Sequence, residues 1–255
     1  MLLPTFTRRS LLLLSILTAG CANVCMAATP IKYSKTAIML DGFALEASWS
    51  EVAFRELDQI LIGDKLATED FNGRYKLLWN EDALYLYFVF TDDVLADAYA
   101  NPLEKYWEDD CVEIFVDEDA SGGNHQYDYN AFAYHIALDG NVVDIGPREA
   151  NGNAVPLLFN HHIQSKWRRA ADTHELHWEI KIALYDDNYL PNQQHQSVRL
   201  AANKTIGFML AYCDADGAGK REHFIGSYPI TPVNGDKNLG YITADVFEKM
   251  RLIHQ

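Results

Sequence analysis

The run from 107 to 117, Trp-Glu-Asp-Asp-Cys-Val-Glu-Ile-Phe-Val-Asp, alternates in polarity over its second half. Val112, Ile114 and Val116 fall on one side of an extended chain, because successive side chains of a strand point to opposite faces. We therefore predict a strand with one apolar face turned to a core. Its other face carries Glu113, and Trp107 stands in the loop just ahead.

A carboxylate on a strand with an indole at its mouth suits a small polar ligand that also has an apolar face. A sugar is such a ligand, because its C–H face lies on an aromatic ring while its hydroxyl groups reach a charged acceptor. The alternative is an ordinary strand with a solvated acidic edge. The run alone leaves both interpretations open.

Short strand-like runs recur along the whole chain, separated by polar turns such as 80–82 and 139–141. This pattern, without any long amphipathic helix, predicts an all-β fold, an antiparallel β-sandwich. We expect a single domain over 29–255, with one or two short helices near 45–49 and 183–190. The other runs are 38–42, 75–79, 84–90, 130–138, 142–145, 161–169, 175–182, 206–213 and 224–230.

The net charge of the chain limits which classes of ligand it is expected to bind. Its 255 residues carry a formal net charge of −15 at pH 7. Such a surface repels phosphate backbones, so nucleic-acid binding is not expected. Neutral ligands and divalent cations remain compatible with it.

The N-terminal segment, 1–28, has the pattern of an export signal: Arg8 and Arg9, then an apolar run from 11 to 19, then small residues. The residues before Cys21 also resemble a lipoprotein box, and the arginine pair faintly resembles a twin-arginine signal. No later stretch is long enough to cross a membrane. We expect the mature protein to be periplasmic, secreted or lipid-anchored in the outer membrane.

Two cysteines remain after such processing, Cys111 and Cys213. An oxidising compartment permits a disulfide between them, which would stabilise the fold by roughly 4–5 kcal/mol in the chain-entropy model. Two separate buried thiols are the alternative.

Several of these pieces, taken in order, resemble carbohydrate-binding module family 9. The run from 107 to 117 is the most specific of them. The others are Asp41-Gly42, Trp49, the runs 77–80 and 84–86, Gly207-Phe208, Asp214 with Asp216, Phe247 and Arg251-Leu252.

The resemblance implies a jelly-roll β-sandwich that holds a glucose- or xylose-based sugar, or an oligosaccharide end, between two aromatic rings. Trp107 and Tyr241 take the places of the rings, and Glu113 that of the carboxylate. The family places an Arg and an Asn after Phe132, where this chain has Ala133 and His135. His135 can donate a hydrogen bond, whereas Ala133 cannot.

The resemblance also implies accessory roles. Family members commonly accompany glycoside hydrolases in polysaccharide catabolism, and they carry structural calcium. The acidic pairs Asp92/Asp93 and Asp117/Asp119 suit that ion, although no segment contains the complete sequence pattern of a calcium-binding loop. No other cofactor is expected.

Hydrolysis, haem binding and a structural role are the alternatives to sugar binding. Intrinsic hydrolysis is not expected, because no second carboxylate is marked by spacing as the partner of Glu113, and no nucleophile elbow is present. Met209 and His223 supply the ligand types of a haem b electron-transfer domain. The alanine at 133 also permits an interaction or structural domain with a degenerate sugar cleft.

Overall fold

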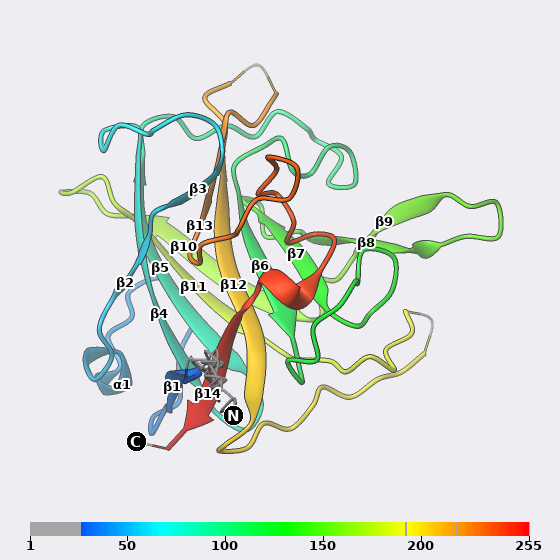
Figure 1. The fold of residues 1–255 in the computed structure, drawn as a ribbon. Helices are drawn as coiled ribbons and strands as arrows, with labels where there is room; N and C mark the ends of the chain where they lie inside the picture. Colours follow the sequence, from blue (N-terminus) through cyan, green and yellow to red (C-terminus); the bar gives the residue numbers. More distant parts are fainter. Residues whose placement is uncertain (1–26, 192, 218, 255) are drawn as a thin grey trace, which may run out of the picture.

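The computed structural model of the protein describes residues 27–191, 193–217 and 219–254. The expected export signal lies almost entirely outside the described residues. The regular elements of the described chain are almost all strands (Figure 1), so the predicted all-β class is confirmed. The elements are β1 (Thr29–Tyr33), α1 (Ala47–Ser50), β2 (Arg55–Leu57), β3 (Gln59–Ile62), β4 (Phe71–Trp79), β5 (Leu84–Asp92), β6 (Cys111–Asp117), β7 (Phe132–Ala137), β8 (Val142–Arg148), β9 (Ala154–Leu158), β10 (Ile163–Arg169), β11 (Leu176–Ile182), β12 (Thr205–Asp214), β13 (His223–Gly226), η1 (Ala244–Val246) and β14 (Glu248–Ile253).

The strands form two groups that β1 joins into one hydrogen-bonded network. One group has the order β10-β11-β5-β4, and the other has the order β14-β12-β6-β7-β8-β9. Strand β1 lies between them and runs parallel to both β4 and β14, whereas the other ladders are antiparallel. The sheet is therefore mixed, a feature that the sequence did not predict. Parallel neighbours need a long connection: α1, β2 and β3 lie between β1 and β4, and almost the entire domain separates β1 from β14.

The two groups of strands pack face to face over an aromatic core. The ring of Tyr212, on β12, contacts Phe71 on β4 and Phe90 on β5, with ring centroids 4.9 and 4.8 Å apart. Trp178 on β11 is fully buried beside Phe90. Burial of each such ring contributes roughly 1.5–3 kcal/mol relative to exposure. This core makes the domain a β-sandwich.

The two expected helices had different outcomes. A helical turn forms at α1 and buries Trp49, as predicted. The helix expected over 183–190 is absent, and that prediction was wrong. Its backbone is engaged by other segments: the N–H of Ala183 bonds the carbonyl of His162, and the carbonyl of Leu184 accepts the N–H of Val198. These long-range hydrogen bonds replace the i to i+4 pattern of a helix.

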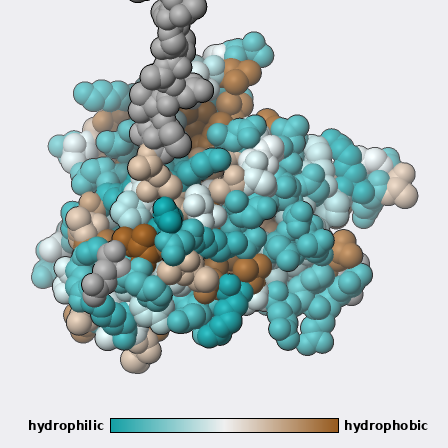
Figure 2. All heavy atoms as spheres, turned by 60° about the horizontal axis from the view of Figure 1, so that its bottom comes forward, coloured by the Kyte–Doolittle hydropathy of each residue, from teal (hydrophilic) through white to brown (hydrophobic). Residues whose placement is uncertain are grey.

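The surface fits the high net charge. Figure 2 shows a face that is mainly hydrophilic, with apolar residues in small separate groups. Among the described residues, no helix has the length and apolar character needed to span a bilayer.

A second, smaller apolar cluster lies on the other face of β6 and β12. Phe115 and Met209 are fully buried there beneath the segment that contains Ile230 and Phe247. This cluster matters for function, because the covering segment also forms one wall of the pocket described below.

Candidate functional site

A pocket of about 320 Å³ opens beside β6, β7 and β8. All four residues that the sequence predicted for sugar binding line it, although they come from three separate parts of the chain. Its lining comprises Tyr106, Trp107, Glu113, Gln126, Ala133, His135, Asp144, Ile145, Arg221, Asn238 and Tyr241.

Two partly exposed aromatic rings stand in the pocket wall. Trp107 is 39% exposed and Tyr241 is 36% exposed, which is unusual for large rings in this chain. Tyr106 packs edge-on against Trp107, with ring centroids 4.9 Å apart, and edge-on against His135 at 4.7 Å. The indole is therefore fixed by a partly buried neighbour while part of its surface stays open to a ligand.

Tyr241 reaches the pocket because Gly240 lets its segment approach the outer face of β6. A Cβ atom at Gly240 would lie 2.8 Å from Cε1 of Phe115 and 2.9 Å from Cε of Met209. Nε2 of His125 also hydrogen-bonds the carbonyl of Gly240, at 2.8 Å. This close approach sets the position of the phenol opposite the β6 side of the pocket.

Glu113 and His135 form the polar floor. They are direct partners in the β6–β7 ladder, and Nε2 of His135 lies 2.9 Å from Oε1 of Glu113. Nδ1 of His135 lies 3.2 Å from the carbonyl oxygen of Ala133. Both ring nitrogens of His135 thus lie close to oxygen atoms, of Glu113 and of Ala133.

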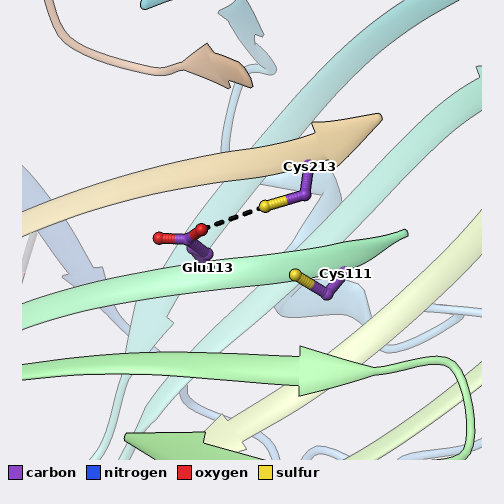
Figure 3. Close-up of side chains that lie close together, drawn as sticks. All are labelled: Cys111, Glu113 and Cys213. Carbon is purple, nitrogen blue, oxygen red and sulfur yellow. Dashed lines mark hydrogen bonds between the residues drawn. The ribbon is translucent and has the colours of Figure 1, made fainter. Parts of the chain in front are cut away.

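Arg221 brings a cation to Glu113, from the loop before β13. Its Nη1 donates to Oε1 of Glu113 at 3.1 Å, and its guanidinium lies over the ring of Phe224. Sγ of Cys213 donates to the same Oε1 at 3.0 Å (Figure 3). Burial alone would raise the pKa of Glu113, but His135, Arg221 and Cys213 together lower it below its ordinary value. The carboxyl is therefore ionised at neutral pH.

Asp144, on β8, is a further buried carboxyl of the pocket that the sequence did not indicate. Its Oδ2 accepts the N–H of Ala133 at 2.9 Å, and its Oδ1 accepts the N–H of Ile145 at 2.7 Å. Burial raises the pKa of Asp144 to about 7. At neutral pH this group can donate as an acid or accept as a carboxylate.

The four aspartates predicted for calcium fall at opposite ends of β12. Asp117 pairs with Gly207 near its start, whereas Asp92 accepts from the phenol of Tyr212 near its end, at 2.6 Å. They therefore cannot bind one ion together. In the loop after β6, Asp117 accepts the N–H groups of Asp119 and Gly122, so its oxygens already close that turn.

At the Asp92 end, oxygens of Asp92, Asp214 and Asp216 lie within 4.8 Å of one another, as do those of Asp70, Asp93 and Asp216. Burial raises the pKa of Asp92 to about 7 and that of Asp214 to about 6. Oδ1 of Asp214 is buried without a hydrogen-bond partner among the described residues. Carboxylates crowded in this way suit a hard divalent cation.

The two cysteines lie opposite each other as free, buried thiols. Cys111 is on β6 and Cys213 on β12, so of the two alternatives the structure has separate thiols. Their sulfurs and a Glu113 oxygen could also be read as metal ligands. Arg221 argues against that reading, because its Nη1 lies 3.2 Å from Sγ of Cys213 and would repel a cation there.

Met209 and His223 do not form a haem site. Met209 is buried in the apolar cluster beside Phe115, and Nδ1 of His223 lies 3.0 Å from Oδ2 of Asp214. Neither residue lines the pocket.

Comparisons with known proteins agree with this architecture. The family model described as "Carbohydrate family 9 binding domain-like" matches residues 40–255. Endo-1,4-beta-xylanase A of Thermotoga maritima is 33% identical over 93 residues, which are 36% of this chain and 8% of that protein. The chain therefore corresponds to only a small part of the xylanase.

Solved structures show the same fold. A carbohydrate binding module family 9 from Caldicellulosiruptor kristjanssonii, in complex with glucose, has a TM-score of 0.61 and 18% identity, covering 89% of this chain and 95% of that chain. Its complex with cellotriose gives 0.60 and 17%, covering 89% and 94%. A putative carbohydrate-binding protein from Bacteroides uniformis gives 0.57 and 13%, covering 89% and 100%.

Proposed function

The chain belongs to the family described as carbohydrate family 9 binding domain-like, and on that premise we propose that its pocket binds one terminal unit of a neutral oligosaccharide. The family is one of non-catalytic binding modules, and the solved relatives are titled as complexes with glucose and cellotriose. Glucose-based or xylose-based sugars are the ligands to test first.

The observation that carries the proposal is the convergence of two half-exposed rings on one buried, ionised carboxylate. Trp107 and Tyr241 offer apolar surface for the C–H face of a pyranose, and Glu113 offers an acceptor for its hydroxyl groups. Arg221 and Asn238 add donors on the same wall. A volume of about 320 Å³ stands at the small end of the range of ligand pockets, which favours a single sugar unit.

The geometry also bears on the alternative of a degenerate cleft. Ala133 removes one donor from β7, but Arg221 enters the pocket from another loop, and His135 is held against Glu113. A pocket that retains charged, hydrogen-bonded groups favours ligand binding over a purely structural role.

The test is calorimetric titration of the folded domain with glucose, cellobiose, xylobiose and their reduced alditols. The proposal predicts saturable one-to-one binding with a Kd from about micromolar to millimolar, typical of small interfaces. Weaker binding of the alditols would show that a closed ring at the chain end is recognised. Absence of heat with every sugar, from a protein shown to be folded, would refute the proposal.

We also propose that the domain is exported and assists polysaccharide breakdown by glycoside hydrolases. The pattern of residues 1–28 and the xylanase relative support this role. Intact mass of the protein purified from its native cells distinguishes the routes: simple cleavage near residue 28, or a diacylglyceryl group on Cys21. A cytosolic protein that retains Met1 would contradict export.

We propose further that Asp92, Asp214 and Asp216 hold a structural calcium ion. The closeness of their oxygens and the unpartnered Oδ1 of Asp214 support the site. Calcium should raise Tm relative to a chelator, and Asp216→Asn should reduce that gain. Asp119→Asn, in the loop at the other end of β12, is the matched control and should leave it unchanged. An equal loss in both variants would contradict this placement.

A further inference from the structure

The carboxylate of Glu113 is hydrogen-bonded on one oxygen only. His135, Cys213 and Arg221 all donate to Oε1, at 2.9, 3.0 and 3.1 Å. Among the described residues none donates to Oε2. Figure 3 shows the second oxygen pointing away from Cys213. Since each carboxylate oxygen has two lone pairs, three donors saturate Oε1 and leave Oε2 for a ligand in the pocket.

One of the three donors is a thiol that a ligand cannot reach. Cys213 is fully buried and does not line the pocket. On β12 it is the diagonal neighbour of Glu113, because Ala211 is the direct partner of Glu113 and Cys213 that of Cys111. Burial raises the pKa of the Cys213 thiol, so it keeps its proton and can donate at neutral pH.

We propose that Cys213 is a positioning residue for the sugar-binding carboxylate: its S–H fixes Oε1 of Glu113 so that Oε2 faces the pocket. This inference rests on the proposed function for its consequence, but its geometry does not depend on any sugar. A merely structural Cys213 would act as a small apolar residue of the core. The two roles predict different effects on the position and the ionisation of Glu113 when the thiol is removed.

The charged and titratable groups that face Glu113 come from every neighbouring element. His135 on β7 and Arg221 before β13 favour its ionised form, whereas Asp144 on β8 opposes it. Tyr106 and Cys111 lie near it as neutral groups. Removal of the thiol donor leaves His135 and Arg221 in place, so the carboxylate should remain in the pocket but be less well fixed and less strongly ionised.

The experiment compares Cys213→Ala, Cys213→Val and Cys213→Ser with Cys111→Ala as the matched control. Cys111 is equally buried on the facing strand but has no hydrogen bond to Glu113 among the described residues. All titrations contain a non-thiol reductant. One readout is the carboxyl ¹³C NMR titration of Glu113, which requires no sugar. The other is the calorimetric Kd for cellobiose between pH 5 and 8.

We expect Cys213→Ala and Cys213→Val to raise the titration midpoint of Glu113 and to weaken cellobiose binding by about 3- to 10-fold at neutral pH. The loss should grow on acidification, because protonation of Glu113 then begins at a higher pH. Cys213→Ser restores a donor and should recover most of the affinity. Cys111→Ala should change neither readout.

Folded Cys213→Ala or Cys213→Val protein with an unchanged midpoint and an unchanged Kd would overturn the inference. Equal effects of the Cys111 and Cys213 variants would overturn it as well, since they would reflect general loosening of the strands. A wild-type protein that binds no sugar, but whose Glu113 midpoint rises in Cys213→Ala, would refute the proposed function and support the positioning role.

Discussion

Replacement of Trp107 by alanine removes the larger of the two rings in the pocket wall. Trp107 is 39% exposed, and a Trp side chain presents about 150–250 Å² in total, so roughly 60–100 Å² of indole is open to a ligand. Covering that area at about 25 cal/mol per Å² contributes about 1.5–2.5 kcal/mol to binding. The variant should therefore bind cellobiose about 10- to 60-fold more weakly.

The fold should tolerate this change. Trp107 precedes β6 and belongs to none of the core clusters, so the free energy of unfolding should change by less than about 1 kcal/mol. Calorimetry gives the Kd and thermal denaturation gives Tm. Phe43→Ala is the control, because Phe43 is also exposed but lies outside the pocket. Unchanged affinity in folded Trp107→Ala would refute the platform role, and a large drop in Tm would show that the indole is a structural residue.

Three further predictions concern the pocket and the acidic residues around Asp92. Glu113→Gln should weaken sugar binding by about 10- to 100-fold, because hydrogen bonds to a charged acceptor contribute about 1.5–3 kcal/mol; unaltered calorimetric affinity would exclude Oε2 as the acceptor. Gly240→Ala should weaken binding with little loss of secondary structure by circular dichroism, because its Cβ would meet Phe115 at 2.8 Å and shift Tyr241; wild-type affinity would contradict that. In a chelator, Tm should fall as pH rises from 5 to 8. Burial raises the pKa of Asp92 to about 7 and that of Asp214 to about 6. The folded state is therefore favoured while these carboxyl groups are protonated, and this stabilisation is lost as the pH rises through these pKa values. Calcium should reduce this fall in Tm. A Tm that rises with pH in the chelator would contradict the effect assigned to Asp92 and Asp214.

From the residues themselves, the sequence predicted only Trp107 and Glu113 of the pocket, and it did not indicate Asp144, although Asp144 lies on the regular strand β8. Alternation over 107–117 placed Glu113 on the face of β6 opposite the core, whereas His135 was predicted through the family resemblance and lies beside Glu113 because of the register of β6 with β7. Tyr241 was predicted only through the family resemblance, because no local pattern shows that Gly240 lets its segment approach Phe115.

Other features depend on contacts far apart in the chain. Arg221 lies 108 residues from Glu113 in a loop without periodicity, so no sequence pattern could have paired them. The parallel position of β1 depends on both ends of the domain. The segment 183–190 contains Asp186, Asp187 and Asn188, which are poor helix formers, and its backbone bonds to His162 and Val198.

A crystal structure of the domain with cellobiose would test sugar binding at this pocket most directly. We predict a terminal pyranose between Trp107 and Tyr241, with a hydroxyl group within hydrogen-bond distance of Oε2 of Glu113 and with Cys213 still bonded to Oε1. A sugar bound elsewhere on the domain, or a pocket that stays empty at saturating cellobiose, would contradict the proposed function.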